Sequence, residues 1–94
     1  MNDSGWIKIH RNMLDWEWYL DSNIVRLFIH LLLKANWEDK KWCGILIKRG
    51  SFVTSHGSLS EETKLSIQQI RTCLSKLKLT DEILIKSTNK HTLK

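Results

Sequence analysis

Proline is absent from this 94-residue chain, and glycine, cysteine and long apolar runs are scarce. With four glycines and no repeat or low-complexity stretch, nothing marks a linker between domains. No apolar run is longer than three residues, the length of Leu31–Leu33, which is far shorter than the roughly 20 residues that cross a bilayer. The first five residues lack the apolar core of a signal peptide. We therefore expect one cytoplasmic domain over residues 1–94, without membrane contact.

The few cysteines and histidines have no spacing that favours metal or disulfide chemistry. Cys43 and Cys73 form neither a disulfide framework nor a CxxC pair, which indicates two reduced thiols. There is no glycine-rich phosphate loop, and no Ser/His/Asp or paired-carboxylate arrangement. We expect no metal, no cofactor and no catalytic activity from this domain, its four histidines being scattered: His10, His30, His56 and His91.

Acidic residues are scarce in the second half of the chain. Residues 1–40 carry five Lys/Arg and six Asp/Glu, a net charge of −1. Residues 41–94 carry ten Lys/Arg and four Asp/Glu, a net charge of +6. A basic half after a neutral one indicates that the second half binds a polyanion. Charge alone equally allows an ordinary solvated basic surface.

The first half combines aromatic residues with one strongly apolar helix. Trp6–His10 alternates apolar with polar residues, which predicts a short strand or an extended arm. Arg11–Leu20 predicts one or two helical turns. Asp21–Asn23 can begin a helix, and the apolar residues of Ile24–Ala35 recur every three or four positions. The apolar stripe of that helix is wide, so it lies either centrally in a core or against a partner.

The middle of the chain predicts a turn, a strand pair and a helix. Asn36–Lys41 is polar and predicts a turn. Ile45–Ile47 and Phe52–Thr54 flank Lys48–Ser51 and predict two strands around a second turn. Ser58–Glu62 then predicts a helix with its acidic residues in the first turn, where the helix dipole favours them.

A second helix start follows quickly. Ser66–Gln69 matches a capping box, and the helix after it has a core face of Ile67, Ile70, Leu74 and Leu77, with Cys73 at the edge. Ile83–Lys86 and His91–Leu93 predict two short strands around a hairpin tip. Two helices across a short turn, followed by a hairpin, predict an α+β winged helix-turn-helix fold.

In such a fold the second helix enters the major groove of DNA. The face opposite the core has Gln68, Thr72 and Ser75 at its centre, and we expect the contacts to come from Gln68, Gln69, Arg71, Thr72, Ser75 and Lys76. No acidic residue lies between Ser66 and Thr80. Lys86 and Lys90 in the hairpin are predicted to contact phosphate. An ordinary exposed helix and a solvated turn are the alternatives.

All five tryptophans fall in the first half, away from the predicted DNA face. Core packing explains them most simply. Alternatively, some of them form a self-association surface together with the wide stripe of the apolar helix. The residues predicted for that surface are Trp16, Trp18, Ile29 and Leu33.

Several segments together resemble one family: Gly5–Arg11, Asp15–Tyr19, Arg26–Asn36, Arg49–Ser55, Ser66–Leu77 and Ile85–Lys90. They are similar to the amino-terminal winged-helix domain of DnaD-like replication initiation proteins, or phage replisome organisers. The resemblance implies a domain that binds double-stranded or single-stranded DNA, or self-associates, while recruiting a helicase or helicase loader. A transcriptional regulator with the same motif is an alternative, because a fold does not fix a function.

The sequence departs from this family at two points. A glycine is common in the turn between the two helices, but here Lys64-Leu65 stands in its place. We therefore expect the turn to close without a left-handed residue. Family members usually continue into a second domain that helps to bind DNA. A chain of 94 residues is therefore expected to be either a piece of a longer protein or a stand-alone version.

Overall fold

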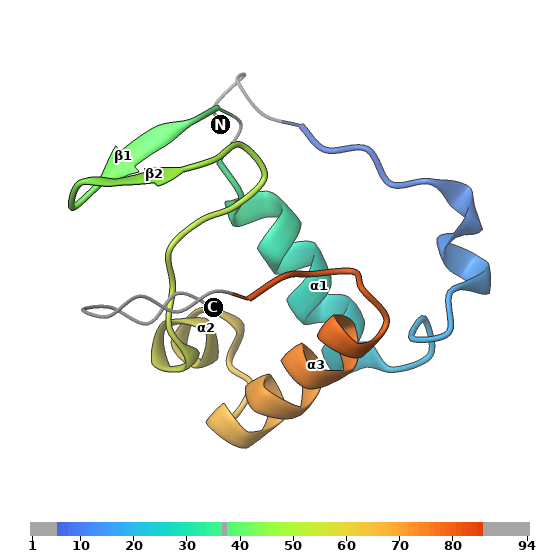
Figure 1. Cartoon of the computed structure of the whole chain (residues 1–94). Helices are drawn as coiled ribbons and strands as arrows, with labels where there is room; N and C mark the ends of the chain where they lie inside the picture. Colours follow the sequence, from blue (N-terminus) through green and yellow to red (C-terminus); the bar gives the residue numbers. More distant parts are fainter. Residues whose placement is uncertain (1–5, 37, 86–94) are drawn as a thin grey trace. The chain divides into compact units, whose positions relative to one another are not determined.

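The computed structural model describes residues 6–36 and 38–85 and divides the chain into two units, Met1–Phe52 and Val53–Lys94. The described residues form three α-helices, one short 3-10 helix and a two-stranded antiparallel sheet (Figure 1). The predicted α+β class is confirmed. A single domain over residues 1–94 stays a prediction.

The first unit begins with an extended segment and a helical turn. Trp6–His10 forms no strand, whereas the 3-10 helix η1 (Arg11–Asp15) confirms the helical turn predicted after it. His10 caps η1, because its Nδ1 accepts the backbone N–H of Asn12 at 3.1 Å. Helix α1 (Ser22–Lys34) starts within the predicted helix-starting residues Asp21–Asn23, and its cap is Asp21. The Asp21 Oδ1 accepts the Ile24 N–H at 3.1 Å and so satisfies one unpaired donor of the first turn.

The sheet pairs different segments from those that the sequence predicted. Strand β1 (Lys40–Trp42) pairs with β2 (Ile45–Ile47), so part of the predicted polar turn is a strand. Cys43 and Gly44 between them have φ of 50° and 77°. Two successive left-handed residues form the type of turn that joins a tight hairpin, and glycine adopts this conformation without strain.

Phe52–Thr54 forms no strand, and the prediction that it pairs with β2 is wrong. The predicted turn over Lys48–Ser51 is present, since the Ser51 N–H donates to the Lys48 carbonyl at 3.1 Å. The last residue of that turn bonds to the chain just beyond α1: the Asn36 N–H donates to the Ser51 carbonyl at 3.0 Å. Ser51 is thereby directed to Asn36 instead of extending a ladder with β2.

In the second unit, helix α2 (His56–Thr63) begins earlier than predicted. Its cap is Ser55, whose Oγ accepts the Ser58 N–H at 3.1 Å. Glu61 and Glu62 therefore lie in the last turn of α2. The prediction that they lie in the first turn, where the helix dipole would favour them, is wrong.

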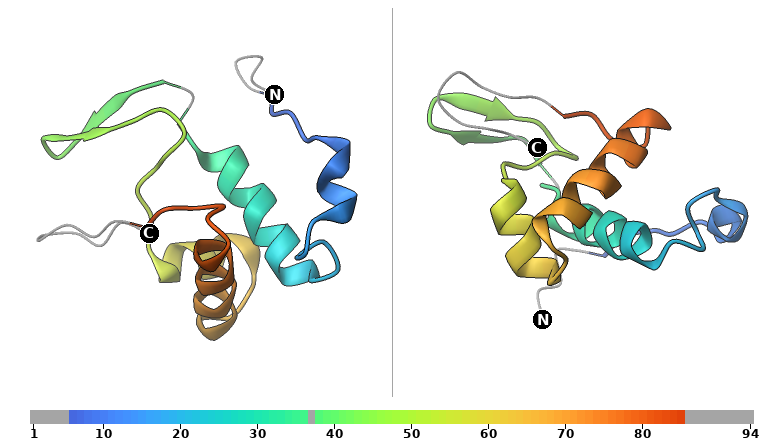
Figure 2. Two further views of the ribbon diagram at one scale, coloured as in Figure 1. Left: turned by 45° about the vertical axis from the view of Figure 1, so that its right-hand side comes forward. Right: turned by 90° about the horizontal axis from the view of Figure 1, so that it is seen from below.

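Helix α3 (Ile67–Leu79) begins at the predicted capping box, which is confirmed. The Ser66 Oγ accepts the Gln69 N–H at 3.0 Å, and the Gln69 Oε1 accepts the Ser66 N–H at 2.8 Å. Residues 64–66 alone separate α2 from α3, and both views in Figure 2 show how short this connection is. The short turn that was predicted between the two helices is therefore present.

The turn does contain a left-handed residue, contrary to expectation. Lys64 has φ 64° and ψ 19°, and its N–H donates to the Ser60 carbonyl at 2.8 Å. Two side chains of α2 make further hydrogen bonds in and beside this turn. The Ser60 hydroxyl donates to the Leu65 carbonyl at 2.5 Å. The Thr63 hydroxyl donates to the Leu59 carbonyl at 2.7 Å. These bonds hold in place a backbone conformation that glycine would adopt with less strain.

We expect Lys64→Gly to raise the free energy of unfolding by about 0.5–1 kcal/mol, because it relieves the left-handed strain. Lys78→Gly is the matched control, since Lys78 is an exposed residue within α3. The same substitution there should lower the free energy of unfolding by about 0.5–1 kcal/mol. Urea denaturation measures both. Two shifts of the same sign would contradict the expectation.

Helices α2 and α3 contact each other, and the second unit contains a group of buried, mostly apolar side chains. Its buried side chains are Leu59, Thr63, Leu65, Ile70, Cys73, Leu74 and Leu77. Cys73 belongs to this core and not to its edge, whereas Ile67 is 45% exposed and leaves the predicted core face. Cysteine is among the most frequently buried residue types, which explains the exchange.

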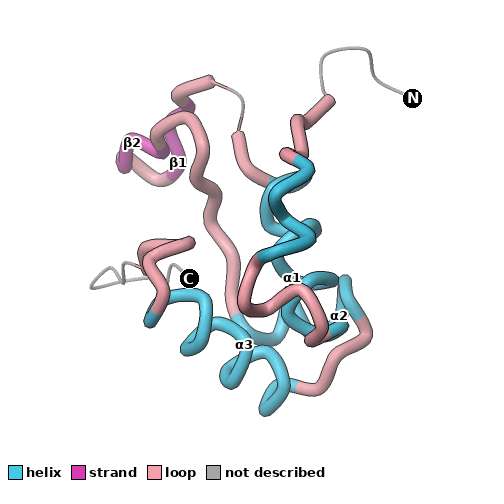
Figure 3. The backbone as a smooth tube through the Cα atoms, turned by 90° about the vertical axis from the view of Figure 1, so that its right-hand side faces the viewer, coloured by secondary structure: helices cyan, strands magenta, loops and turns pink. Residues whose placement is uncertain are grey.

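The chain after α3 turns sharply and is not a strand. Asp81 is left-handed with φ 64°, and the Glu82 N–H donates to the Leu77 carbonyl at 3.0 Å, as in a Schellman motif. The predicted strand is absent from Ile83–Ile85, which Figure 3 draws as loop. Lys86 and the second predicted strand, His91–Leu93, lie outside the described residues.

Candidate nucleic-acid interface

The outward face of α3 is polar except at its carboxyl end, where Leu79 lies on it and is 78% exposed. The helix turns by about 100° per residue, so the face opposite Ile70, Cys73, Leu74 and Leu77 is centred on Gln68, Thr72 and Ser75. All three are exposed. The observed core face includes Cys73 where the predicted one included Ile67. The outward face is therefore rotated by roughly 30° about the helix axis from the predicted outward face. The rotation brings Arg71 closer to its centre and moves Lys76 away.

The side chains on this face provide hydrogen-bonding groups of several kinds. The Gln68 amide nitrogen lies 3.5 Å from the Thr72 hydroxyl, one helical turn further on. Arg71 is exposed at the flank and presents a guanidinium that can donate two parallel hydrogen bonds. Glutamine can pair with adenine and arginine with guanine in the major groove, while hydroxyls reach bases or phosphates.

Gln69 takes part in the capping box of α3, and this limits the contacts that it can make with DNA. Its carboxamide oxygen accepts the Ser66 N–H in the capping box. A two-bond pair with adenine needs both the oxygen and the NH₂ group of a glutamine. While the cap is intact, Gln69 can therefore offer DNA only the donors of its NH₂ group, and it also positions the first turn of α3.

The predicted lysines differ in their surroundings. Lys76 is half-buried, and Lys76 and Lys78 both lie in the last turn of α3, where the helix dipole favours positive charge. Their presence thus has an explanation within the helix itself. Lys86 and Lys90 lie outside the described residues.

The sequence missed one surface residue at the start of α3. Ile67 is the first residue of the helix, is 45% exposed, and precedes Gln68. An apolar side chain at this end of a recognition helix can contact the thymine methyl group. The signal was available in the capping box, because it places Ile67 in the first turn, before the buried stripe begins.

No family model, curated protein or solved structure matches the chain. The assignment of the site therefore depends on its own geometry. Within residues 6–36 and 38–85, no three His, Cys, Asp or Glu side chains gather where they could hold a metal ion. In the same part of the chain, no helix has the length and apolar character needed to cross a membrane.

The residues predicted for self-association differ in how exposed they are. Trp16, Trp18 and Ile29 are half-buried, and Leu33 is exposed. The Trp16 ring lies 4.9 Å from that of Phe28, centroid to centroid, at an interplanar angle of 49°. This contact fits the core-packing alternative for Trp16. Other apolar side chains of the first unit are exposed as well: Trp6, Ile9, Leu14 and Leu20.

Proposed function

We propose that this chain is a winged helix-turn-helix module that binds double-stranded DNA, with α3 in the major groove. The observation that carries the proposal is the pair α2 and α3 across a three-residue turn, with an acid-free outward face on the second helix. The buried face of α3 packs on α2, so the polar face remains available to a partner. Gln68, Arg71 and Thr72 contact base edges, and Ser75 contacts phosphate.

A titration of the whole chain against duplex DNA tests the proposal. The affinity should fall steeply with salt, because each phosphate contact releases counterions and contributes about 0.9 to the log–log slope. Single-stranded DNA of the same sequence is the comparison, with the mass of the protein measured in the same buffer. Absence of duplex binding at low salt would refute the proposal.

Arg71→Ala should weaken specific duplex binding by roughly 1–3 kcal/mol, because it removes a pair of directed hydrogen bonds. Arg26→Ala is the matched control: Arg26 is exposed on α1 and carries the same charge. Fluorescence anisotropy on a preferred duplex and on an unrelated one separates sequence preference from charge. Equal losses for the two variants would contradict a role of Arg71 in base recognition.

The proposal extends to the replication initiation proteins that the chain resembles. The tryptophan-rich start and the apolar helix carry that resemblance, and they imply a helicase or helicase loader as a protein partner. Co-purification of the whole chain with the helicase and loader of its own replication system tests this extension. A complex with neither protein would favour the transcriptional alternative.

A specific observation favours self-association as a second candidate function. Trp6, Leu14 and Leu20 are 77%, 65% and 95% exposed, and all lie in the segment before α1. Exposed apolar side chains gathered in one segment are typical of interaction sites. A monodisperse monomer at high concentration, measured by light scattering, would contradict this second function.

A further inference from the structure

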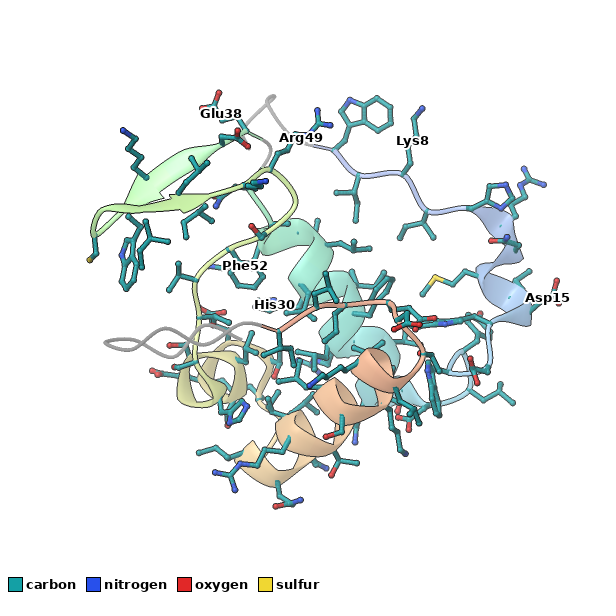
Figure 4. The ribbon with its side chains drawn as sticks, in the orientation of Figure 1. Lys8, Asp15, His30, Glu38, Arg49 and Phe52 are labelled. Atoms are coloured by element: carbon teal, nitrogen blue, oxygen red, sulfur yellow. The ribbon has the colours of Figure 1, made fainter. Side chains whose placement is uncertain are left out.

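The β1–β2 hairpin has a concentration of exposed cations that the proposed function does not use. We call residues 40–49 the basic hairpin. Lys40, Lys41, Lys48 and Arg49 are all exposed. Two acidic residues precede the basic hairpin, and Glu38 and Arg49 both lie at its open end (Figure 4). The Asp39 Oδ1 there accepts the Arg49 backbone N–H at 2.8 Å, so this carboxylate closes the base of the hairpin.

The strand register divides the basic hairpin into two faces. Lys41 is opposite Leu46, and Lys40 is opposite Ile47, which is buried. Side chains alternate along a strand, so Lys41 and Leu46 share the outer face. Lys48 is the exposed residue directly after β2, and continued alternation would place it on the same side as Leu46. Within the part of the chain that the structure describes, Lys41 and Lys48 take part in no ion pair.

These cations lie on or next to a short two-stranded antiparallel ladder. Its turn comprises only Cys43 and Gly44, and three residue pairs make up the ladder. Two lysines of the same charge on one face repel each other and do not stabilise the ribbon. A bound polyanion would offset the repulsion between the two lysines, since phosphates along a nucleic acid can accept hydrogen bonds from both ammonium groups.

We propose that the basic hairpin is a second nucleic-acid contact, in which Lys41 and Lys48 bind backbone phosphates and Lys40 and Arg49 add to the field at its edges. This inference rests on the proposed function and adds a sequence-independent contact to it. Lysine binds phosphate as a point charge, so the contact supplies affinity without reading bases. Leu46 is the one apolar side chain on the outer face, too little for insertion into a lipid surface.

The test compares two double variants of the whole chain that lose equal charge. Lys41→Gln/Lys48→Gln removes the outer cations and keeps side chains that can still hydrogen-bond. Lys8→Gln/Arg26→Gln is the control, since both residues are exposed and lie outside the hairpin. On a duplex of mixed sequence, the slope of log affinity against log salt should fall by about two units for the hairpin variant. It should stay unchanged for the control.

Each outcome decides between the hairpin inference and the proposed function. Equal slopes for the two double variants overturn the inference, and if Arg71→Ala still weakens binding, the proposed function stands. A reduced slope for the hairpin variant with no effect of Arg71→Ala supports the hairpin and overturns the role of α3. Absence of duplex binding overturns both. Loss of binding to vesicles of anionic lipid, with an unchanged slope on DNA, would assign the hairpin to a membrane surface instead.

Discussion

Replacing Leu77 by alanine is expected to lower the free energy of unfolding by about 2–5 kcal/mol. Leu77 is fully buried in the second unit, on the face of α3 opposite Gln68 and Thr72. The truncation removes three carbon atoms from a core that also contains Leu59 and Ile70 and leaves a cavity there. Since the free energy of unfolding of a native protein is about 5–15 kcal/mol in total, the expected loss is a large fraction of it.

Leu79→Ala is the matched control for this prediction. Leu79 lies on the same helix two residues later and is 78% exposed, so its truncation should change the free energy of unfolding by less than about 0.5 kcal/mol. Urea denaturation followed by far-ultraviolet circular dichroism measures both variants. Similar losses for the two leucines would show that the core does not lie on the face assigned to it.

The helices could be predicted because their signals are local. Asp21 and Ser66 each satisfy backbone N–H groups within three residues of themselves, and Gln69 completes the capping box from inside the same turn. No distant contact is needed to place these boundaries. The start of α2 was missed by two residues, because the helix was predicted from Ser58, whereas its cap is Ser55, whose side chain bonds to that of Ser58 at 3.1 Å.

The sheet could not be predicted from the same kind of signal. Ile45–Ile47 was correctly identified as a strand, but its partner is Lys40–Trp42 and not Phe52–Thr54. The apolar pattern of Phe52–Thr54 looked like a strand, whereas the two lysines of β1 looked like a turn. The pairing is decided by Cys43 and Gly44, because consecutive left-handed residues fold β2 back onto the residues just before it.

The candidate site was predicted in outline and changed in detail. Gln68, Arg71, Thr72 and Ser75 are exposed on α3 as expected. Periodicity alone placed Ile67 on the core face and Cys73 at its edge, whereas the structure buries Cys73 and leaves Ile67 exposed. The double role of Gln69 was implicit in the capping box, since a residue that closes the cap has one fewer group for DNA.

Replacing Ile24 by alanine should also lower the free energy of unfolding by about 2–5 kcal/mol, through the cavity that the truncation leaves. Ile24 is fully buried at the start of α1, whereas Leu33 near its other end is 63% exposed. Leu33→Ala is therefore the control and should cost less than about 0.5 kcal/mol in the monomer. If Leu33 takes part in self-association, its truncation lowers the mass at high concentration and leaves the unfolding of the monomer unchanged.

The tryptophans make this last prediction informative about the whole chain. All five precede Val53, so their fluorescence arises from residues of the first unit, while circular dichroism includes the helices of both units. If residues 1–94 fold as the predicted single domain, Ile24→Ala shifts both signals to the same urea concentration. A fluorescence transition that moves alone, with the remaining circular dichroism transition in place, would show that the two units unfold independently.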